Sequence, residues 1–169
     1  MRIPFASSLD QESSDGNPRA GARVEKTNMF VLVFLAALSS GSVEQAVLDG
    51  VNRYRTDRGL ASLEWNEAAA EEARSHCRSL LTGPVAAPHA GFEGRVARLK
   101  KRVSFRSAAE NVGLLSLRDR LSDVVVRMWL SSDTHRRNLT GPYQRTGIGV
   151  VQSNGMVCAT QILLGAPER

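Results

Sequence analysis

The stretch TGIGVVQSNGMVCATQIL, residues 146–163, decides the fold that the sequence predicts. Two apolar runs flank the triplet Ser153-Asn154-Gly155. Asn-Gly between such runs is the strongest short-range signal for a β-hairpin, because both residues tolerate the positive φ of a tight turn. The stretch therefore predicts two antiparallel strands, over residues 146–152 and 156–163.

Upstream of this hairpin, apolar residues recur every three or four positions, which is the period of an amphipathic helix. One predicted helix begins at Val43 and ends near Gly59, and a second runs from about Asn66, an N-cap residue type, to Leu81. A third is expected over residues 118–130. Helices followed by an antiparallel hairpin predict an α/β layered domain rather than a doubly wound one.

The composition suits a single domain with a short extension. The chain has 169 residues, of which 22 are Lys or Arg and 17 are Asp or Glu, giving a formal net charge of +5. This charge favours contact with anionic lipid or acidic cell-wall polymer. No zinc-finger spacing, Walker loop or RNA-binding signature is present, so nucleic acid is not an expected partner. A basic run is expected to form a solvated face: Arg95, Arg98, Lys100, Lys101, Arg102 and Arg106.

The N-terminal 42 residues differ from the rest. Residues 1–28 are polar and predict a disordered extension, or a segment upstream of the true start. Residues 29–42 hold the apolar run MFVLVFLAAL followed by SSGS, which is typical of a signal peptide. The run is shorter than the roughly 20 residues that span a bilayer. We therefore expect a secreted or cell-envelope protein; the alternative is a buried core helix.

The two cysteines, Cys77 and Cys158, fit neither a CxxC metal site nor a redox motif. They can pair in an exported protein, whereas in the cytosol they would be free thiols. The sequence leaves both alternatives open.

Three residues form the candidate site. His89 and His135 lie in Gly/Pro-rich and Ser/Thr-rich segments, and Glu110 stands among small and apolar residues. Two imidazoles and a carboxylate can ligate a divalent metal such as zinc, or act as acid and base near neutral pH. The alternative is that each histidine braces a loop and that Glu110 accepts backbone hydrogen bonds.

Five ordered motifs resemble those of bacterial CAP domains, the SCP-like superfamily of cysteine-rich secretory, antigen-five and pathogenesis-related proteins. This resemblance implies an α-β-α sandwich with a central antiparallel sheet over residues 43–166. The motifs are VNxxRxxxGLxxLxWN (51–66), HxGFxxR (89–95), AENV (109–112), WLSSDTHRxNL (129–139) and GIGV (147–150).

The resemblance also implies a cleft with two histidines and two glutamates. His89 is similar in position to the first histidine, Glu110 to the first glutamate and His135 to the second histidine. The second glutamate should follow Trp129, where this chain has Leu-Ser-Ser-Asp. Asp133 is a stand-in, although an N-cap or turn role fits it better.

The function expected from the sequence is that of a secreted, monomeric and non-enzymatic binding module. Its partner would be an anionic lipid, a cell-wall polymer or a small apolar ligand. Alternatives are a hydrolase that uses a histidine with Glu110, and an envelope protein that acts through the basic run alone. The expected ligand-binding residues are His89, Glu110, Asn111, His135 and Gln161.

Overall fold

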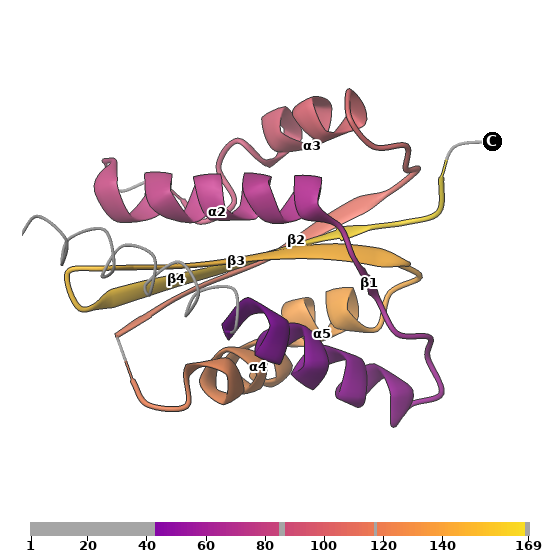
Figure 1. Ribbon diagram of the computed structural model, residues 1–169, viewed down its shortest axis with the longest axis horizontal. Coiled ribbons are helices and arrows are strands. Elements are labelled where there is room, and N and C mark those ends of the chain that lie inside the picture. Colours follow the sequence, from indigo (N-terminus) through magenta and orange to yellow (C-terminus); the bar gives the residue numbers. More distant parts are fainter. Residues whose placement is uncertain (1–42, 85–86, 117, 168–169) are drawn as a thin grey trace, which may run out of the picture.

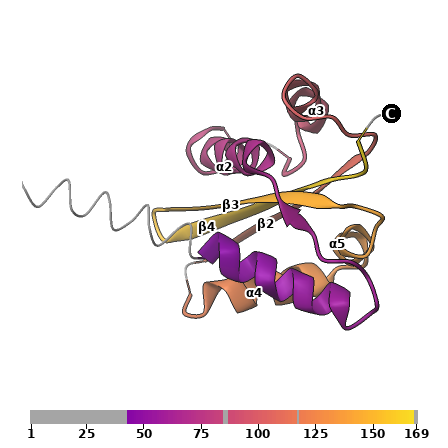
Figure 2. The same cartoon turned by 45° about the vertical axis from the view of Figure 1, so that its right-hand side comes forward.

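Three layers build the structure, a computed structural model that describes residues 43–84, 87–116 and 118–167. The helices α2 (Glu67–Thr82) and α3 (Phe92–Lys100) cover one face of the sheet (Figure 1). A helix over residues 43–56, α4 (Leu121–Ser131) and α5 (Asp133–Leu139) cover the other face, as the turned view in Figure 2 also shows. The predicted α-β-α sandwich is confirmed.

In the described residues the sheet has four strands in the order β1-β3-β4-β2. They are β1 (Glu64–Trp65), β2 (Ala108–Ser116), β3 (Arg145–Ser153) and β4 (Met156–Leu164). β4 pairs antiparallel with both β3 and β2, whereas the short β1 pairs parallel with β3. The predicted hairpin is β3–β4, and its turn residues Asn154 and Gly155 have φ of 50° and 74°.

All three predicted helices are present, with shifted ends. Asn66 caps α2, because its Oδ1 accepts a hydrogen bond from the Ala69 amide at 3.0 Å. α4 begins at Leu121, three residues later than the predicted start at 118. The helix α3 was not predicted, because the basic run that begins at Arg95 was expected to form a solvated face rather than part of a helix packed on the sheet.

Close packing and a disulfide join α2 to the sheet. A Cβ atom at Gly147 or Gly149 of β3 would collide with the backbone of α2, so only glycine permits this approach. Cys77 of α2 and Cys158 of β4 form a disulfide with a Cα–Cα distance of 5.3 Å. Of the two alternatives for these cysteines, the structure shows the paired one.

Successive residues of β2 and β4 face opposite layers, as the pleat of a strand requires. Ile162 and Leu164 pack with Leu99 and Phe105 on the α2/α3 side. Leu163, in contrast, belongs to the larger core on the α4/α5 side. On β2, the adjacent residues Glu110 and Asn111 therefore lie in different layers of the molecule, although both are candidate site residues.

The predictions for residues 1–28 and 29–42 lie outside the described residues. Within the part that the structure describes, no helix is long and apolar enough to cross a membrane.

Candidate functional site

Glu110 is a carboxylate held inside the α2/α3 layer. It is only 4% exposed, and both of its oxygens accept hydrogen bonds from Arg95 of α3, each at 2.8 Å. Arg95 is itself buried. A two-point contact between guanidinium and carboxylate is among the strongest side-chain pairs, and it compensates the cost of burying each charge.

His89 connects this buried pair to solvent. It lies in a turn that precedes α3, where Gly91 has a φ of 74°. The Nδ1 atom of His89 lies 3.1 Å from Oε1 of Glu110, while the side chain remains 54% exposed. Since the carboxylate accepts, Nδ1 carries the proton, and in the neutral form of the ring Nε2 holds the lone pair.

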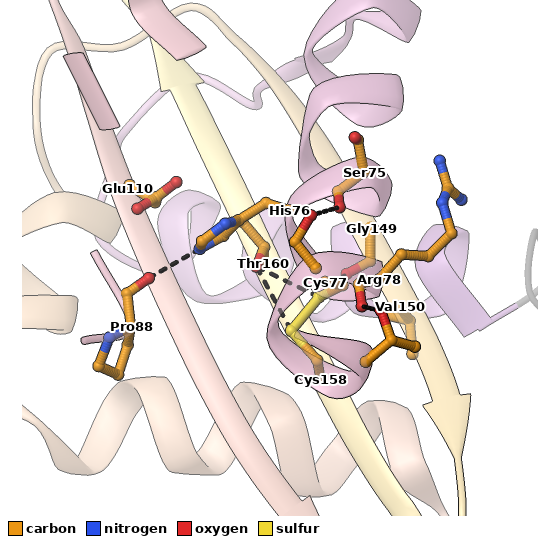
Figure 3. The surroundings of a disulfide bond; sticks show 12 residues. Ser75, His76, Cys77, Arg78, Pro88, Glu110, Gly149, Val150, Cys158 and Thr160 are labelled. Carbon is orange, nitrogen blue, oxygen red and sulfur yellow. Dashed lines mark hydrogen bonds between the residues drawn. A yellow bond between two sulfur atoms is a disulfide. The ribbon is translucent and has the colours of Figure 1, made fainter. Parts of the chain in front are cut away.

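His76 is a fourth member of this cluster, and it was not among the predicted site residues. It lies on α2, and its Nε2 donates to the Pro88 carbonyl at 2.7 Å (Figure 3). Burial lowers the pKa of His76, and this effect outweighs the hydrogen bond to Pro88 and the charge of Glu110, which raise the pKa. One feature of the sequence could have pointed to His76. It directly precedes Cys77, on the buried side of the helix.

An open hollow of about 190 Å³ reaches the cluster between α2 and α3. Its lining includes His76, Arg95 and Ala90, together with the α2 hydroxyls of Ser75 and Ser79. Leu80 and Ala87 also line it, so the hollow combines polar and apolar groups.

The opposite layer holds a neutral amide network. Asn111 and Gln161 are paired across β2 and β4, both are fully buried, and Asn111 Nδ2 donates to Gln161 Oε1 at 3.1 Å. Asn138 of α5 donates to Asn111 Oδ1 at 2.9 Å and to the Glu110 carbonyl at 3.2 Å. The network braces α5 against β2, and Gln161 does not face solvent.

His135 belongs to this second layer and lies in α5, not in the connection that its Ser/Thr-rich context predicted. Ser132 caps the helix by accepting from the His135 amide. Burial lowers the pKa of His135, and the charge of His89 lowers it further. The two histidines thus lie within electrostatic reach, but only His89 hydrogen-bonds Glu110. The predicted trio is therefore a contacting pair with a third residue nearby.

This arrangement does not fit a divalent cation. In the described ranges, no group of three or more His, Cys, Asp or Glu side chains could hold a metal ion. Arg95 also places a positive charge against both oxygens of Glu110. A cation at Glu110 would have to displace this guanidinium, so zinc binding by His89, Glu110 and His135 stays a prediction.

A comparison with known protein families decides to which family the chain belongs. Residues 48–162 match the family described as CAP, the Cysteine-rich secretory protein family. The chain belongs to the CAP family. The resemblance inferred from the five motifs is confirmed, and the match covers the layers that hold both the ionic cluster and the amide network.

Relatives of this CAP domain include proteins from several bacteria. The uncharacterized protein YkwD of Bacillus subtilis is 25% identical over 158 residues, which are 90% of this chain and 59% of YkwD. The membrane protein YlbC of the same bacterium is 30% identical over 63% of this chain, which corresponds to 31% of YlbC. The chain thus spans less than two thirds of the length of either relative.

Solved structures share the fold. A cysteine-rich secretory protein from Staphylococcus aureus has a TM-score of 0.61 at 21% identity, covering 75% of this chain and 39% of that one. An extracellular protein with an SCP domain from Bacillus anthracis has a TM-score of 0.55 at 26% identity, covering 75% of this chain and 41% of that one.

The structure also decides the role of Asp133, the suggested stand-in for the second glutamate. Its side chain is 80% exposed and pairs with Arg136 one turn along α5, and the N-cap of the helix is Ser132. The stand-in hypothesis is wrong, because Asp133 points to solvent rather than to Glu110.

The basic run does not form one solvated face. Arg95 is buried against Glu110, while Arg98 pairs with Glu72 and Arg102 with Glu71 of α2. These acidic partners compensate the three arginine charges within the CAP domain. The prediction that Arg95 is solvated was wrong, because its guanidinium pairs with the buried carboxylate of Glu110.

Proposed function

We propose that this CAP domain is a non-enzymatic binding module that works outside the cytoplasm and contacts its ligand through His89. One observation carries this proposal: an exposed imidazole is backed by a buried carboxylate, Glu110, that Arg95 holds in place. Such support fixes the ring orientation before a ligand arrives, which lowers the entropic cost of binding.

Export is supported by several independent features. Residues 29–42 have the pattern of a signal peptide, and Cys77 and Cys158 are joined in a disulfide, which persists in oxidising compartments. The similar proteins of known structure include one described as extracellular and one described as an outer surface protein.

The ligand that fits best is a hydroxyl-rich or amide-rich cell-wall polymer. In the neutral ring of the half-exposed His89, Nε2 can accept a hydrogen bond from such a ligand, and the hollow that reaches Ala90 offers the Ser75 and Ser79 hydroxyls. Arg95 and Glu110 cancel each other in charge, which gives no strong preference for an anion. A purely apolar ligand would leave these polar groups without partners, at a cost in binding free energy.

Hydrolysis is the second candidate, and the same geometry favours it. A carboxylate that orients an imidazole through Nδ1 leaves Nε2 as a general base, as in many hydrolases. Enzyme and binding module therefore share His89 and Glu110, and they differ only in whether the bound ligand is cleaved.

The experiment is an NMR titration of the ¹⁵N-labelled full chain with three separate probes. These are soluble peptidoglycan fragments, phosphatidylglycerol vesicles and Zn²⁺ alone. We expect the fragments to perturb the amides around His89, and the variant His89→Ala to lose this response. Lys101→Ala, an exposed change at the end of α3, is the matched control and should respond as the wild type does.

Other outcomes decide between the remaining functions. Release of shortened fragments by the wild type, lost in His89→Ala, would establish the hydrolase. A response to vesicles that survives His89→Ala would contradict the proposal and favour a charged surface. A response to Zn²⁺ at His89 together with His135 would favour the metal hypothesis.

A further inference from the structure

The turn that carries His89 is held from two sides by buried side chains. His76 of α2 donates from Nε2 to the Pro88 carbonyl at 2.7 Å, and Arg95 of α3 donates from Nη1 to the Ala90 carbonyl at 2.9 Å. These carbonyls lie on either side of His89. A carbonyl only accepts hydrogen bonds, so the proton of the His76 ring must be on Nε2.

Pro88 makes the contact from His76 hard to replace. Proline has no amide hydrogen, so the carbonyl is the one polar backbone group through which this residue can be held. The Pro88 carbonyl belongs to the peptide bond that leads directly into His89. Rotation of this peptide would move the Cα atom of His89 and with it the ring.

The helix that carries His76 is itself fixed at that position. Cys77, the next residue, is completely buried and bonded to Cys158 of β4, and Thr160 Oγ1 lies 3.3 Å from its sulfur (Figure 3). Figure 3 shows the ring of His76 reaching away from α2 toward Pro88. The sheet, the disulfide, His76 and the His89 turn thus form one connected series of contacts.

We propose that His76 is the positioning residue for His89. By holding the Pro88 carbonyl it sets the ring of His89 where Nδ1 donates to Glu110 and Nε2 faces the ligand. The importance of this contact for binding rests on the function proposed above, whereas the geometry of the His89 ring can be measured without any ligand.

A purely packing role for His76 makes a different prediction. The side chain is only 7% exposed, so a ring of similar size without a donor would satisfy packing alone. His76→Phe supplies such a ring, and His76→Gln retains a donor close to the position of Nε2. The two variants therefore separate volume from hydrogen bonding.

The test is ¹⁵N NMR of the histidine rings in the full chain, with urea unfolding of each variant alongside. We expect one Nδ1–H tautomer for His89 in the wild type and in His76→Gln, and a mixture of both tautomers in His76→Phe. Binding of peptidoglycan fragments should weaken up to about tenfold in His76→Phe only, corresponding to one lost hydrogen bond.

Two results would overturn the proposal. One is an unchanged His89 ring in a folded His76→Phe, and the other is a disturbed His89 ring in His76→Gln. If His76→Phe does not fold, the wild type still decides, because a His76 ring with its proton on Nδ1 could not donate to Pro88. Fragments that fail to bind the wild type would refute the proposed function but leave this measurement valid.

Discussion

Polar side chains are buried on both sides of strand β2, but their partners differ in kind. On the α2/α3 side, the carboxylate of Glu110 pairs with Arg95 and also contacts His89, which is half-exposed to solvent. On the α4/α5 side, Asn111 is a neutral amide enclosed by Gln161 and Asn138. Adjacent residues on one strand thus build a partly exposed ionic cluster and a buried amide network. The difference suggests that the ionic side meets the ligand and the amide side holds its frame.

The largest effect is expected when Arg95 is removed. Arg95→Met keeps the stem but leaves Glu110 buried and unpaired, so we expect a loss of about 3–5 kcal/mol in the free energy of unfolding. The control is Arg98→Met on the same helix, whose partly exposed pair with Glu72 is worth about 0–1 kcal/mol. Urea unfolding compares the two, and equal losses would contradict the buried ion pair.

A smaller loss is expected on the amide side. Asn111→Leu keeps the branched outline of the side chain but removes the hydrogen-bond partner of both Gln161 and Asn138, which should cost about 1–3 kcal/mol. Gln45→Leu removes an exposed hydrogen bond to Asp49 and should leave stability nearly unchanged. The contrast between the two sides would fail if Asn111→Leu lost as much stability as Arg95→Met in the same assay.

The pH dependence of stability involves one histidine from each side. Burial lowers the pKa of both His76 and His135, whereas an unfolded histidine titrates near 6.5. Below about pH 6.5 the unfolded chain therefore binds more protons than the folded one, and the free energy of unfolding falls as the pH decreases. Above that pH the contribution is fully present.

Unfolding curves between pH 7.5 and 5 test this expectation. His76→Gln and His135→Gln should each flatten the acid loss, and the double variant should flatten it most. If neither substitution changes how the free energy of unfolding depends on pH, groups other than these two histidines cause the loss of stability in acid.

The smallest change in stability is expected at the exposed end of the ionic cluster. His89→Ala removes a half-exposed ring, while Glu110 retains both hydrogen bonds from Arg95, so the loss should stay below about 1 kcal/mol. Ligand binding should nevertheless disappear. A strongly destabilised His89→Ala in urea unfolding would instead indicate a structural brace.

Local signals in the sequence were sufficient for the hairpin and for three of the helices, whereas the sandwich was implied by the resemblance to CAP domains. Asn154-Gly155 can hardly be anything but a tight turn between two apolar runs, and Asn66 has the side chain that caps α2. Glu110 was identified because a carboxylate among small and apolar residues needs a partner. Each of these predictions depends on residues that are close together along the chain.

The partners themselves depend on distant contacts, which the sequence does not show. Arg95 looks like its basic neighbours, and only the packing of α3 on the sheet turns it toward Glu110. His135 was expected in a loop because Ser132 is a turn former, but the same hydroxyl caps a short helix. His76 was passed over since nothing local indicates that its ring reaches Pro88, twelve residues away.

Ring NMR of the three histidines during ligand addition tests the central claim most directly. Each ring gives separate signals, and soluble peptidoglycan fragments serve as the probe. The structure predicts that the ring of His89 responds to the fragments, while that of His135, in α5 on the other side of the sheet, does not. A response at His135 with His89 unmoved would place the ligand on the other side of β2 and contradict this account.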